Sequence, residues 1–292
     1  MHIGVTGATG FVGKKLVDVA LRRGHEVVAF TRHPQRAIPG CEMRRFSLDA
    51  VPNVEGCEAI VHLAGEPVAG IWTKKKKREI VDSRVIGTRR IVEAIQAAKV
   101  KPEVLVSGSA IGFYGERGEE ELTEASAPGA GFLAETVIVW EAEALKATDT
   151  RVVLLRTSVV LGEKGGALAA MLPAFKMGLG GPLGSGRQWM SWIHLEDLVS
   201  LIIFAVENLD VKGALNATAP WPVRNADYTK TLAQTLHRPA FFKVPAWALK
   251  LALGGFSCEV LESKRVLPAV ATDHGFGFRF PELAPALQHL CG

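Results

Sequence analysis

The first thirteen residues, MHIGVTGATGFVG, constrain the fold more than any other part of the chain. The apolar run HIGVT predicts a strand, and a helical repeat of apolar side chains begins at Phe11. Between them, Gly7 permits a tight turn, Gly10 lets the backbone approach a pyrophosphate, and Gly13 lets helix and strand pack closely. The segment therefore predicts a dinucleotide site, and the alternative is a glycine turn with a purely structural role.

Strand-like and helix-like segments alternate through the first two thirds of the chain. Apolar, β-branched runs lie at 2–6, 26–32, 59–65, 103–109 and 151–162, and helical patterns lie near 11–23, 75–98 and 131–146. Because the runs are apolar on both faces, they indicate a parallel sheet covered by helices on both sides. The predicted fold class is α/β, a doubly wound parallel sheet of the Rossmann type with a smaller C-terminal substrate lobe.

The character of the sequence changes after residue 162. The segment GLGGPLGSGRQW (178–189) is rich in glycine, and seven prolines occur between residues 219 and 292. We predict that residues 1–162 plus 195–218 form the cofactor-binding domain, in which 195–218 supply a helix and a strand that return to the sheet. Residues 163–194 plus 219–292 are predicted to form the smaller substrate-binding lobe.

Composition argues against several classes of function. The formal net charge of +4 is too small to indicate nucleic acid or a membrane surface as a partner, and the basic run 74–78 is interpreted as a solvated helix start. The four cysteines lack metal-binding spacing, and neither a secretion signal nor a membrane-spanning run is visible. We predict a cytoplasmic protein without metal that acts on a small molecule, and a homodimeric state is left open.

The end of the second predicted strand distinguishes between two dinucleotides. An NAD enzyme places an acidic residue about 20 residues beyond the glycines, where it binds the ribose 2′-hydroxyl. No acid occurs between Glu26 and Glu42, and Thr31 and Arg32 stand there instead. The planar, permanently charged guanidinium of Arg32 suits a 2′-phosphate. The sequence predicts NADP(H), and the alternative is an arginine that only lies on the surface.

Several motifs resemble the extended short-chain dehydrogenase/reductases and sugar-nucleotide epimerases. They are the glycine pattern, HLAG at 62–65, RVIGT at 84–88, the serine-rich strand end at 107–109 and WIHLEDL at 192–198. Other motifs are typical of one atypical branch, the NAD-dependent epimerase family proteins, which are sometimes called cell-division inhibitors. These are LAGEPV, DSR at 82–84, GFLAETVIVWE and, in the tail, GFGFRFPEL. The branch carries a C-terminal domain of unknown function, and the resemblance runs from end to end.

The resemblance implies a set of cofactor contacts. Gly7, Gly10, Phe11, Val12 and Gly13 would hold the pyrophosphate, Thr31 and Arg32 the adenosine phosphate, and Leu63, Ala64 and Gly65 would form the strand end beneath the cofactor. Arg84 would be a further cofactor contact, and Val159 with Val160 would line the nicotinamide end.

The catalytic motif of the family is missing. Typical members use Y-x-x-x-K, in which the lysine lowers the tyrosine pKa from about 10 so that the phenol can exchange a proton. The chain has two tyrosines, and the residues four positions after Tyr114 and Tyr228 are Gly118 and Leu232. The helix that should carry the motif offers no acid–base pair at this spacing.

Three residues remain candidates for a catalytic role. Ser109 stands where the family has a serine that hydrogen-bonds the reacting oxygen, although it could also satisfy loop backbone groups. Glu66 follows HLAG at the carboxyl edge of the sheet, where open α/β folds bind ligands, and the alternative is a surface or salt-bridging glutamate. Tyr114 is a candidate proton donor without a tuning lysine, so packing or capping is the favoured role for it.

Two further residues are interpreted as structural. Glu141 is expected to pair with Arg84 or Arg156, and His194 is expected to cap a helix or lie in the core.

Two functions fit these observations. The first is an NADP(H)-dependent oxidoreductase or epimerase-like enzyme that acts on a small carbonyl or sugar-nucleotide-like substrate. The second is an NADP(H)-binding, redox-responsive scaffold without turnover. The glycine loop and Arg32 support both, the missing tyrosine–lysine pair favours the scaffold, and Ser109 in a two-lobed cleft favours the enzyme.

Overall fold

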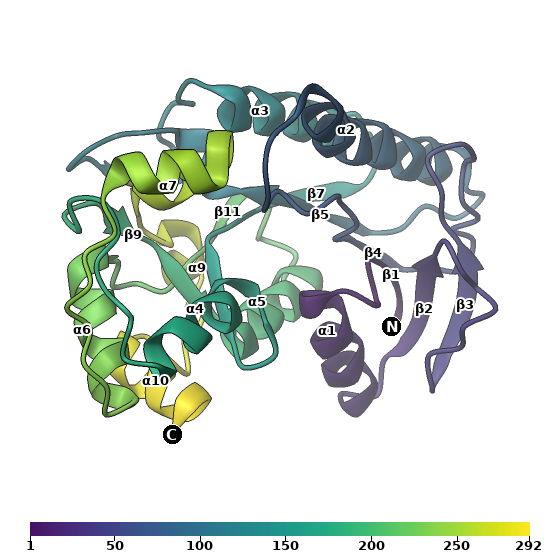
Figure 1. The fold of residues 1–292 in the computed structure, drawn as a ribbon. Helices are drawn as coiled ribbons and strands as arrows, with labels where there is room; N and C mark the ends of the chain where they lie inside the picture. The colour runs from purple at the N-terminus through teal and green to yellow at the C-terminus, as the bar shows by residue number, and fades with distance from the viewer.

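A seven-stranded parallel sheet forms the centre of the protein in the computed structural model, which describes residues 1–292 (Figure 1). The strand order is β3-β2-β1-β4-β5-β7-β11, and every neighbouring pair is parallel. The strands are β1 (His2–Thr6), β2 (Glu26–Thr31), β3 (Cys41–Arg45), β4 (Ala59–His62), β5 (Val104–Ala110), β7 (Arg151–Thr157) and β11 (Gly213–Ala217). The order steps outward from β1 in both directions, which confirms the predicted doubly wound fold.

Helices cover both faces of this sheet (Figure 1). On one face α1 (Phe11–Arg22) packs against α5 (Leu195–Glu207), and on the other α2 (Lys74–Ala97) packs against α3 (Phe132–Ala144). The larger hydrophobic core lies between the sheet and α1 with α5, and a smaller one lies beneath α2. The strands are buried on both faces, as a parallel sheet between two helical layers requires. The basic run 74–78 begins α2, as predicted.

Two details differ from the predicted elements. The edge strand β3 is absent from the predicted set, because its sequence CEMRR has no apolar run and is half exposed. The run 151–162 is two strands rather than one. After β7 the chain leaves the sheet at Ser158, whose hydroxyl donates to the Ala217 carbonyl at 2.9 Å. It continues as β8 (Val159–Gly162), which pairs with β10 (Trp192–His194).

The remaining elements form a region beside the sheet (Figure 1). Two more strand pairs are β9 (Trp189–Met190) with β12 (Val223–Arg224), and β6 (Glu121–Leu122) with β13 (Arg265–Val266). The helices are η1 (Ile111–Tyr114), α4 (Gly166–Lys176), α6 (Asn225–Thr235), α7 (Ala246–Leu253), η2 (Gly254–Phe256), α8 (Ser257–Leu261), α9 (Ala269–Asp273) and α10 (Leu283–Cys291). A separate core lies among α4, α6 and α10. Residues 195–218 return to the main sheet as α5 and β11, as predicted, while the division into two domains stays a prediction.

The C-terminal segment is tied into the sheet by buried polar contacts. The Asp197 carboxylate at the start of α5 accepts the backbone N–H groups of Arg279 and Phe280 at 2.8 and 2.9 Å. Further along, Asn216 of β11 donates to the Leu267 carbonyl at 2.9 Å. Because Asp197 and Asn216 are fully or almost fully buried, these contacts replace water that the two side chains would otherwise bind.

Candidate cofactor site

The N-terminus of α1 is free of side-chain caps. Gly10 occupies the N-cap position and has no side chain that could accept a bond, and no acidic residue lies in the first turn. The first N–H groups of a helix lack partners within it, and they add to the positive end of the helix dipole. The arrangement is that of an anion-binding helix start, as the glycine pattern predicts.

The glycine loop leaves no room for side chains. Gly7 has a φ of +70°, which side-chain-bearing residues rarely adopt, and a β-carbon there would lie 3.0 to 3.1 Å from the backbone of Leu63 and Ala64. A β-carbon on Gly13 would overlap the carbonyl oxygen of Gly7. These contacts supply the tight turn and the close helix–strand packing that a dinucleotide site needs.

A cavity of about 340 Å³ lies above this loop at the carboxyl edge of the sheet. Eight of the predicted site residues line it, namely Gly7, Gly10, Phe11, Val12, Gly13, Leu63, Gly65 and Ser109. Seven more were not among the predicted site residues: Pro67, Gly108, Trp140, Leu155, Thr157, Leu198 and Ile202. Four of them, Pro67, Gly108, Trp140 and Leu198, lie within motifs that resemble the family. No lining side chain carries a charge, so a pyrophosphate held here would depend on the backbone N–H groups of the loop.

Thr6 and His62 hold the strand end beneath the cavity. The Thr6 hydroxyl accepts the N–H groups of Leu63 and Ala64, both at 3.1 Å, and lies 2.7 Å from Nδ1 of His62. With two bonds accepted, the Thr6 hydroxyl donates to Nδ1, which assigns the ring proton to Nε2. Burial lowers the pKa of His62 to about 4, so the imidazole is neutral at pH 7. Sequence reasoning missed both residues, which lie 56 positions apart.

Arg84 lies just behind the cavity wall. Its Nη1 donates to the carbonyls of Glu66 and Ile80 at 3.0 and 3.1 Å, and its guanidinium lies 5.1 Å from the centre of the Trp140 ring, which lines the cavity. Burial lowers the pKa of Arg84 to about 10, with the Glu66 charge acting in the opposite direction. In this structure Arg84 supports the loop after β4, and its predicted contact with a cofactor stays a prediction.

Thr31 is the last residue of β2, and Arg32 follows it. The Thr31 hydroxyl accepts the N–H of His33 at 3.2 Å. The Arg32 side chain is exposed and makes neither a hydrogen bond nor an ion pair. The predicted contact of Arg32 with an adenosine phosphate stays a prediction.

Ser109, the second-last residue of β5, lines the cavity and belongs to a buried ion-pair network. Its hydroxyl lies 2.6 Å from Oε1 of Glu141, and Arg156 donates to the same carboxylate from Nε at 2.8 Å and from Nη2 at 2.9 Å. Glu141 is therefore the partner of Arg156 rather than of Arg84, the two alternatives that the sequence left open. These three side chains come from β5, α3 and β7.

Tyr114 lies in the same network but away from the cavity. It is fully buried, its hydroxyl donates to Oδ1 of Asn216 at 2.7 Å, and it accepts a bond from Nη1 of Arg156 at 3.0 Å. Burial raises its pKa above the usual value near 10, although Arg156 lowers it in part. Both bonding capacities of the hydroxyl are used within the protein, so the geometry favours the packing role over the predicted catalytic one.

Glu66 and Val160 do not line the cavity. The Glu66 side chain, half exposed, pairs with Lys76 at 2.5 Å, while its neighbours Gly65 and Pro67 line the cavity. This is the surface ion pair that the sequence left as the alternative. Val160 packs toward the core, and the cavity is lined instead by Leu155 and Thr157 of β7.

His194 caps α5, as predicted, because its Nδ1 accepts the N–H of Glu196 at 3.1 Å. Burial lowers its pKa to about 4, as it does for His62. An unfolded histidine titrates near 6.5, so below that pH the unfolded chain binds more protons and the folded state loses stability.

We expect the free energy of unfolding to fall by about 2 kcal/mol per buried histidine from about pH 7.5 to about pH 5. Urea denaturation at the two pH values measures the difference. His194→Asn keeps a capping oxygen and should remove about half of the drop. An equal drop in wild type and variant would contradict this role for His194.

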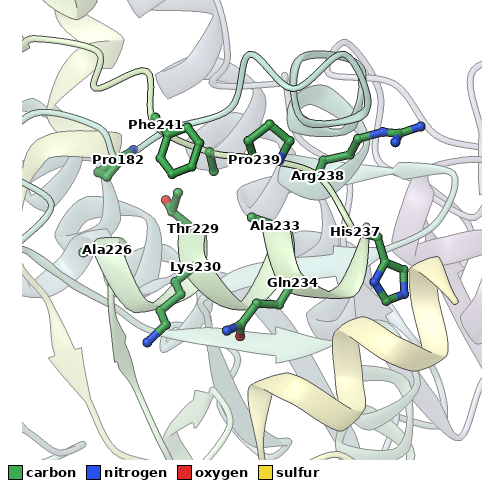
Figure 2. Close-up of a pocket in the computed structure, with 11 residues that line it drawn as sticks. Pro182, Ala226, Thr229, Lys230, Ala233, Gln234, His237, Arg238, Pro239 and Phe241 are labelled. Atoms are coloured by element: carbon green, nitrogen blue, oxygen red, sulfur yellow. The ribbon is translucent and has the colours of Figure 1, made fainter.

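A larger cavity, of about 660 Å³, lies elsewhere and shares no lining residue with the first (Figure 2). Pro239 and Phe241 face Thr229 and Ala233 of α6 across it. The charged end of Lys230 points away from Phe241, so the polar groups do not converge as they do in a catalytic site (Figure 2).

One group of side chains has the chemistry of metal ligands, Cys258, Glu259 and Glu262. The ammonium of Lys264 lies 2.6 Å from the Glu262 carboxylate and 3.4 Å from that of Glu259. The lysine therefore supplies the positive charge that a metal ion would bring.

Fold and site together define an α/β protein of the short-chain dehydrogenase/reductase type. Residues 3–217 match the NAD dependent epimerase/dehydratase family, and residues 244–290 match a domain of unknown function, DUF1731. The chain belongs to the NAD-dependent epimerase/dehydratase family, in the branch that the sequence motifs indicated.

Relatives align over nearly the whole chain. The chloroplastic SDR39U1 homolog of Arabidopsis thaliana is 42% identical over 299 residues, covering 99% of this chain and 86% of the relative. Epimerase family protein YfhF of Bacillus subtilis is 39% identical, covering 99% and 98%. The crystal structure of human epimerase family protein SDR39U1 (isoform 2) with NADPH has a TM-score of 0.93 at 34% identity, covering 100% of this chain and 99% of that one. Every helix is either too short or too polar to span a lipid bilayer.

Proposed function

We propose that this chain is an NADP(H)-dependent oxidoreductase, epimerase-like in type, that acts on a small carbonyl or sugar-nucleotide-like substrate without a tyrosine–lysine pair. The observation that carries the proposal is the single cavity that joins the glycine loop to Ser109. A bound nicotinamide cofactor supplies or accepts a hydride. The protein contributes the cradle of Gly7, Gly10 and Gly13, the apolar walls of the cavity, and Ser109 beside the reacting oxygen, while water exchanges the proton that accompanies the hydride.

Two observations support the choice of NADP(H). Arg32 stands exposed and unpaired at the end of β2, and the human relative was crystallised with NADPH. Neither an aspartate nor a glutamate is available near that strand end to bind a 2′-hydroxyl.

We expect Arg32→Ala to weaken NADPH binding by about 10- to 100-fold, because the guanidinium would lose charge-assisted bonds to the 2′-phosphate. NADH binding should stay unchanged, since NADH has no phosphate there. Titration of nicotinamide fluorescence measures both. Arg36→Ala, also an exposed arginine after β2, is the matched control and should bind NADPH like wild type. Unchanged NADPH affinity in Arg32→Ala would show that the cofactor assignment is wrong.

Turnover is tested by NADP(H)-dependent absorbance changes across a panel of alcohols, aldehydes, ketones and sugar nucleotides. The proposal predicts steady turnover with at least one of them, lost in Ser109→Ala and retained in Ser107→Ala on the same strand. Tight NADPH binding without turnover on any member would favour the second candidate function.

That second candidate is an NADP(H)-binding scaffold whose conformation follows the state of the cofactor. The positions of Glu66 and Tyr114 favour it, because Glu66 pairs with Lys76 and the Tyr114 hydroxyl is fully bonded within the core. Two of the three candidate catalytic residues therefore have partners outside the cavity and do not line it.

A further inference from the structure

The larger cavity, of about 660 Å³, is a groove along one face of α6. The residues that α6 contributes share that face, because they recur at positions i, i+3, i+4, i+7 and i+8: Ala226, Thr229, Lys230, Ala233 and Gln234. At 1.5 Å of rise per residue they cover about 12 Å, the span of about four residues of an extended peptide. Pro182, Pro239 and Phe241 form the wall across from the helix (Figure 2).

The centre of this α6 groove is apolar and holds one unpartnered hydroxyl. Ala233 lies in the floor, and the Phe241 side chain in the wall is 84% exposed. Thr229 is only 3% exposed, yet its hydroxyl makes no hydrogen bond within the protein and is directed toward the wall (Figure 2). The hydroxyls of Thr231 and Thr235 on the same helix, by contrast, donate to carbonyls four residues earlier. Because buried hydroxyls are normally bonded, the Thr229 hydroxyl indicates a place for a ligand.

The rim of the α6 groove is basic. Lys230, His237 and Arg238 are the ionisable side chains of the lining, and none of them forms an ion pair. The charged ends of Lys230 and Arg238 point outward, away from the Phe241 ring (Figure 2). An apolar centre surrounded by a charged rim is typical of a surface that binds another protein.

The charge of this region distinguishes between possible occupants. Between Asp227 and Glu259 the sequence has four lysines and arginines and no acid. A second copy of the chain would bring the same cations to the groove, and like charges repel. A lipid bilayer is flat and would lie across the rim without reaching the floor at Thr229 and Ala233. A narrow acidic segment of another protein can both enter the groove and neutralise its rim.

We propose that the α6 groove binds a peptide segment of a partner protein in which acidic residues flank apolar side chains. The apolar side chains pack on Ala233 and against Phe241, and the Thr229 hydroxyl bonds a polar group of the peptide. The carboxylates pair with Lys230 and Arg238. The groove shares no residue with the cofactor cavity, so the proposal does not depend on the proposed function.

The test selects binders to the full-length protein from a phage-displayed library of random twelve-residue peptides. Selected peptides are synthesised with a fluorescein label, and fluorescence anisotropy measures their dissociation constants. We expect the selected peptides to carry a net negative charge and at least two apolar residues.

Two variants of the groove should weaken the binding of these peptides by about tenfold or more, namely Phe241→Ser and the double variant Lys230→Glu with Arg238→Glu. The matched controls are Phe242→Ser and Lys243→Glu, because Phe242 and Lys243 are exposed neighbours that do not line the groove. Both controls should bind within about twofold of wild type. All of these side chains are exposed, so urea denaturation should show wild-type stability for every variant.

Four results would overturn the proposal. The first is a selection that yields no peptide whose binding is lost in Phe241→Ser, and the second is enrichment of neutral or basic peptides. The third is a wild-type dimer in sedimentation equilibrium that Phe241→Ser dissociates, since a second copy would then occupy the groove. The fourth is cosedimentation with phosphatidylglycerol vesicles that Phe241→Ser abolishes, since a lipid surface would then be the partner.

Discussion

Deletion of residues 244–292 should abolish the folded state, although the deleted segment adds no strand to the main sheet. Phe280, Leu283 and Leu287 belong to the core among α4, α6 and α10. Without the segment, the buried side chain of Asp197 would lose the N–H groups of Arg279 and Phe280. Lost apolar burial and unsatisfied buried polar groups would together exceed the 5 to 15 kcal/mol by which domains are typically stable.

Far-ultraviolet circular dichroism and urea denaturation of the truncated chain measure this effect. Asp197→Ala in the full-length chain tests separately the bonds of this carboxylate to Arg279 and Phe280. We expect it to lower the free energy of unfolding by about 2 to 4 kcal/mol. Trp247→Ser is the matched control within the same segment, because the Trp247 side chain is 70% exposed. This substitution should change the free energy of unfolding by no more than about 0.5 kcal/mol. A truncated chain that unfolds cooperatively at the wild-type urea concentration would contradict the structural role of this segment.

Glu141→Ala should lower the free energy of unfolding by about 3 to 5 kcal/mol, since it leaves the buried Arg156 guanidinium without its carboxylate. The double variant Glu141→Leu with Arg156→Leu removes both charges and should be less destabilised than Glu141→Ala alone. Urea denaturation of the single and double variants measures the coupling. The matched control is Glu143→Ala, on the same helix, whose partners Arg89 and Lys146 are solvent-accessible and can be hydrated when it is lost. Equal losses for Glu141→Ala and Glu143→Ala would show that the buried pair has no special role.

Most of the fold could be predicted because its signals are local. The strand–glycine–helix order at 2–22 and the doubly apolar runs specify a parallel sheet without reference to distant residues. The edge strand β3 escaped prediction because its residues are half exposed and charged, so it carries no apolar period. The single run at 151–162 concealed a break at Ser158, since apolar composition persists where the chain leaves one sheet for another.

The candidate site was predictable only in part, because only some of its residues lie in segments with a local sequence signal. The glycines, Leu63, Gly65 and Ser109 lie at the ends of strands, and the ends of parallel strands meet at one edge of a sheet. Trp140, Leu198 and Ile202 lie on helices whose facing residues follow from packing angles, which the sequence does not specify.

The sequence by itself determined the parallel α/β fold, a phosphate loop at its first turn, an arginine where an NAD enzyme has an acid, and the absence of Y-x-x-x-K. Each of these features depends on which residue types stand a few positions apart, and over such short spacing the backbone geometry determines the local structure. Only the tertiary structure decided which candidates meet in the cavity. It joined Ser109 to Glu141, 32 residues away, and Glu141 to Arg156. These three side chains come together only when α3 packs against β5 and β7, and that packing depends on contacts between residues far apart in the sequence.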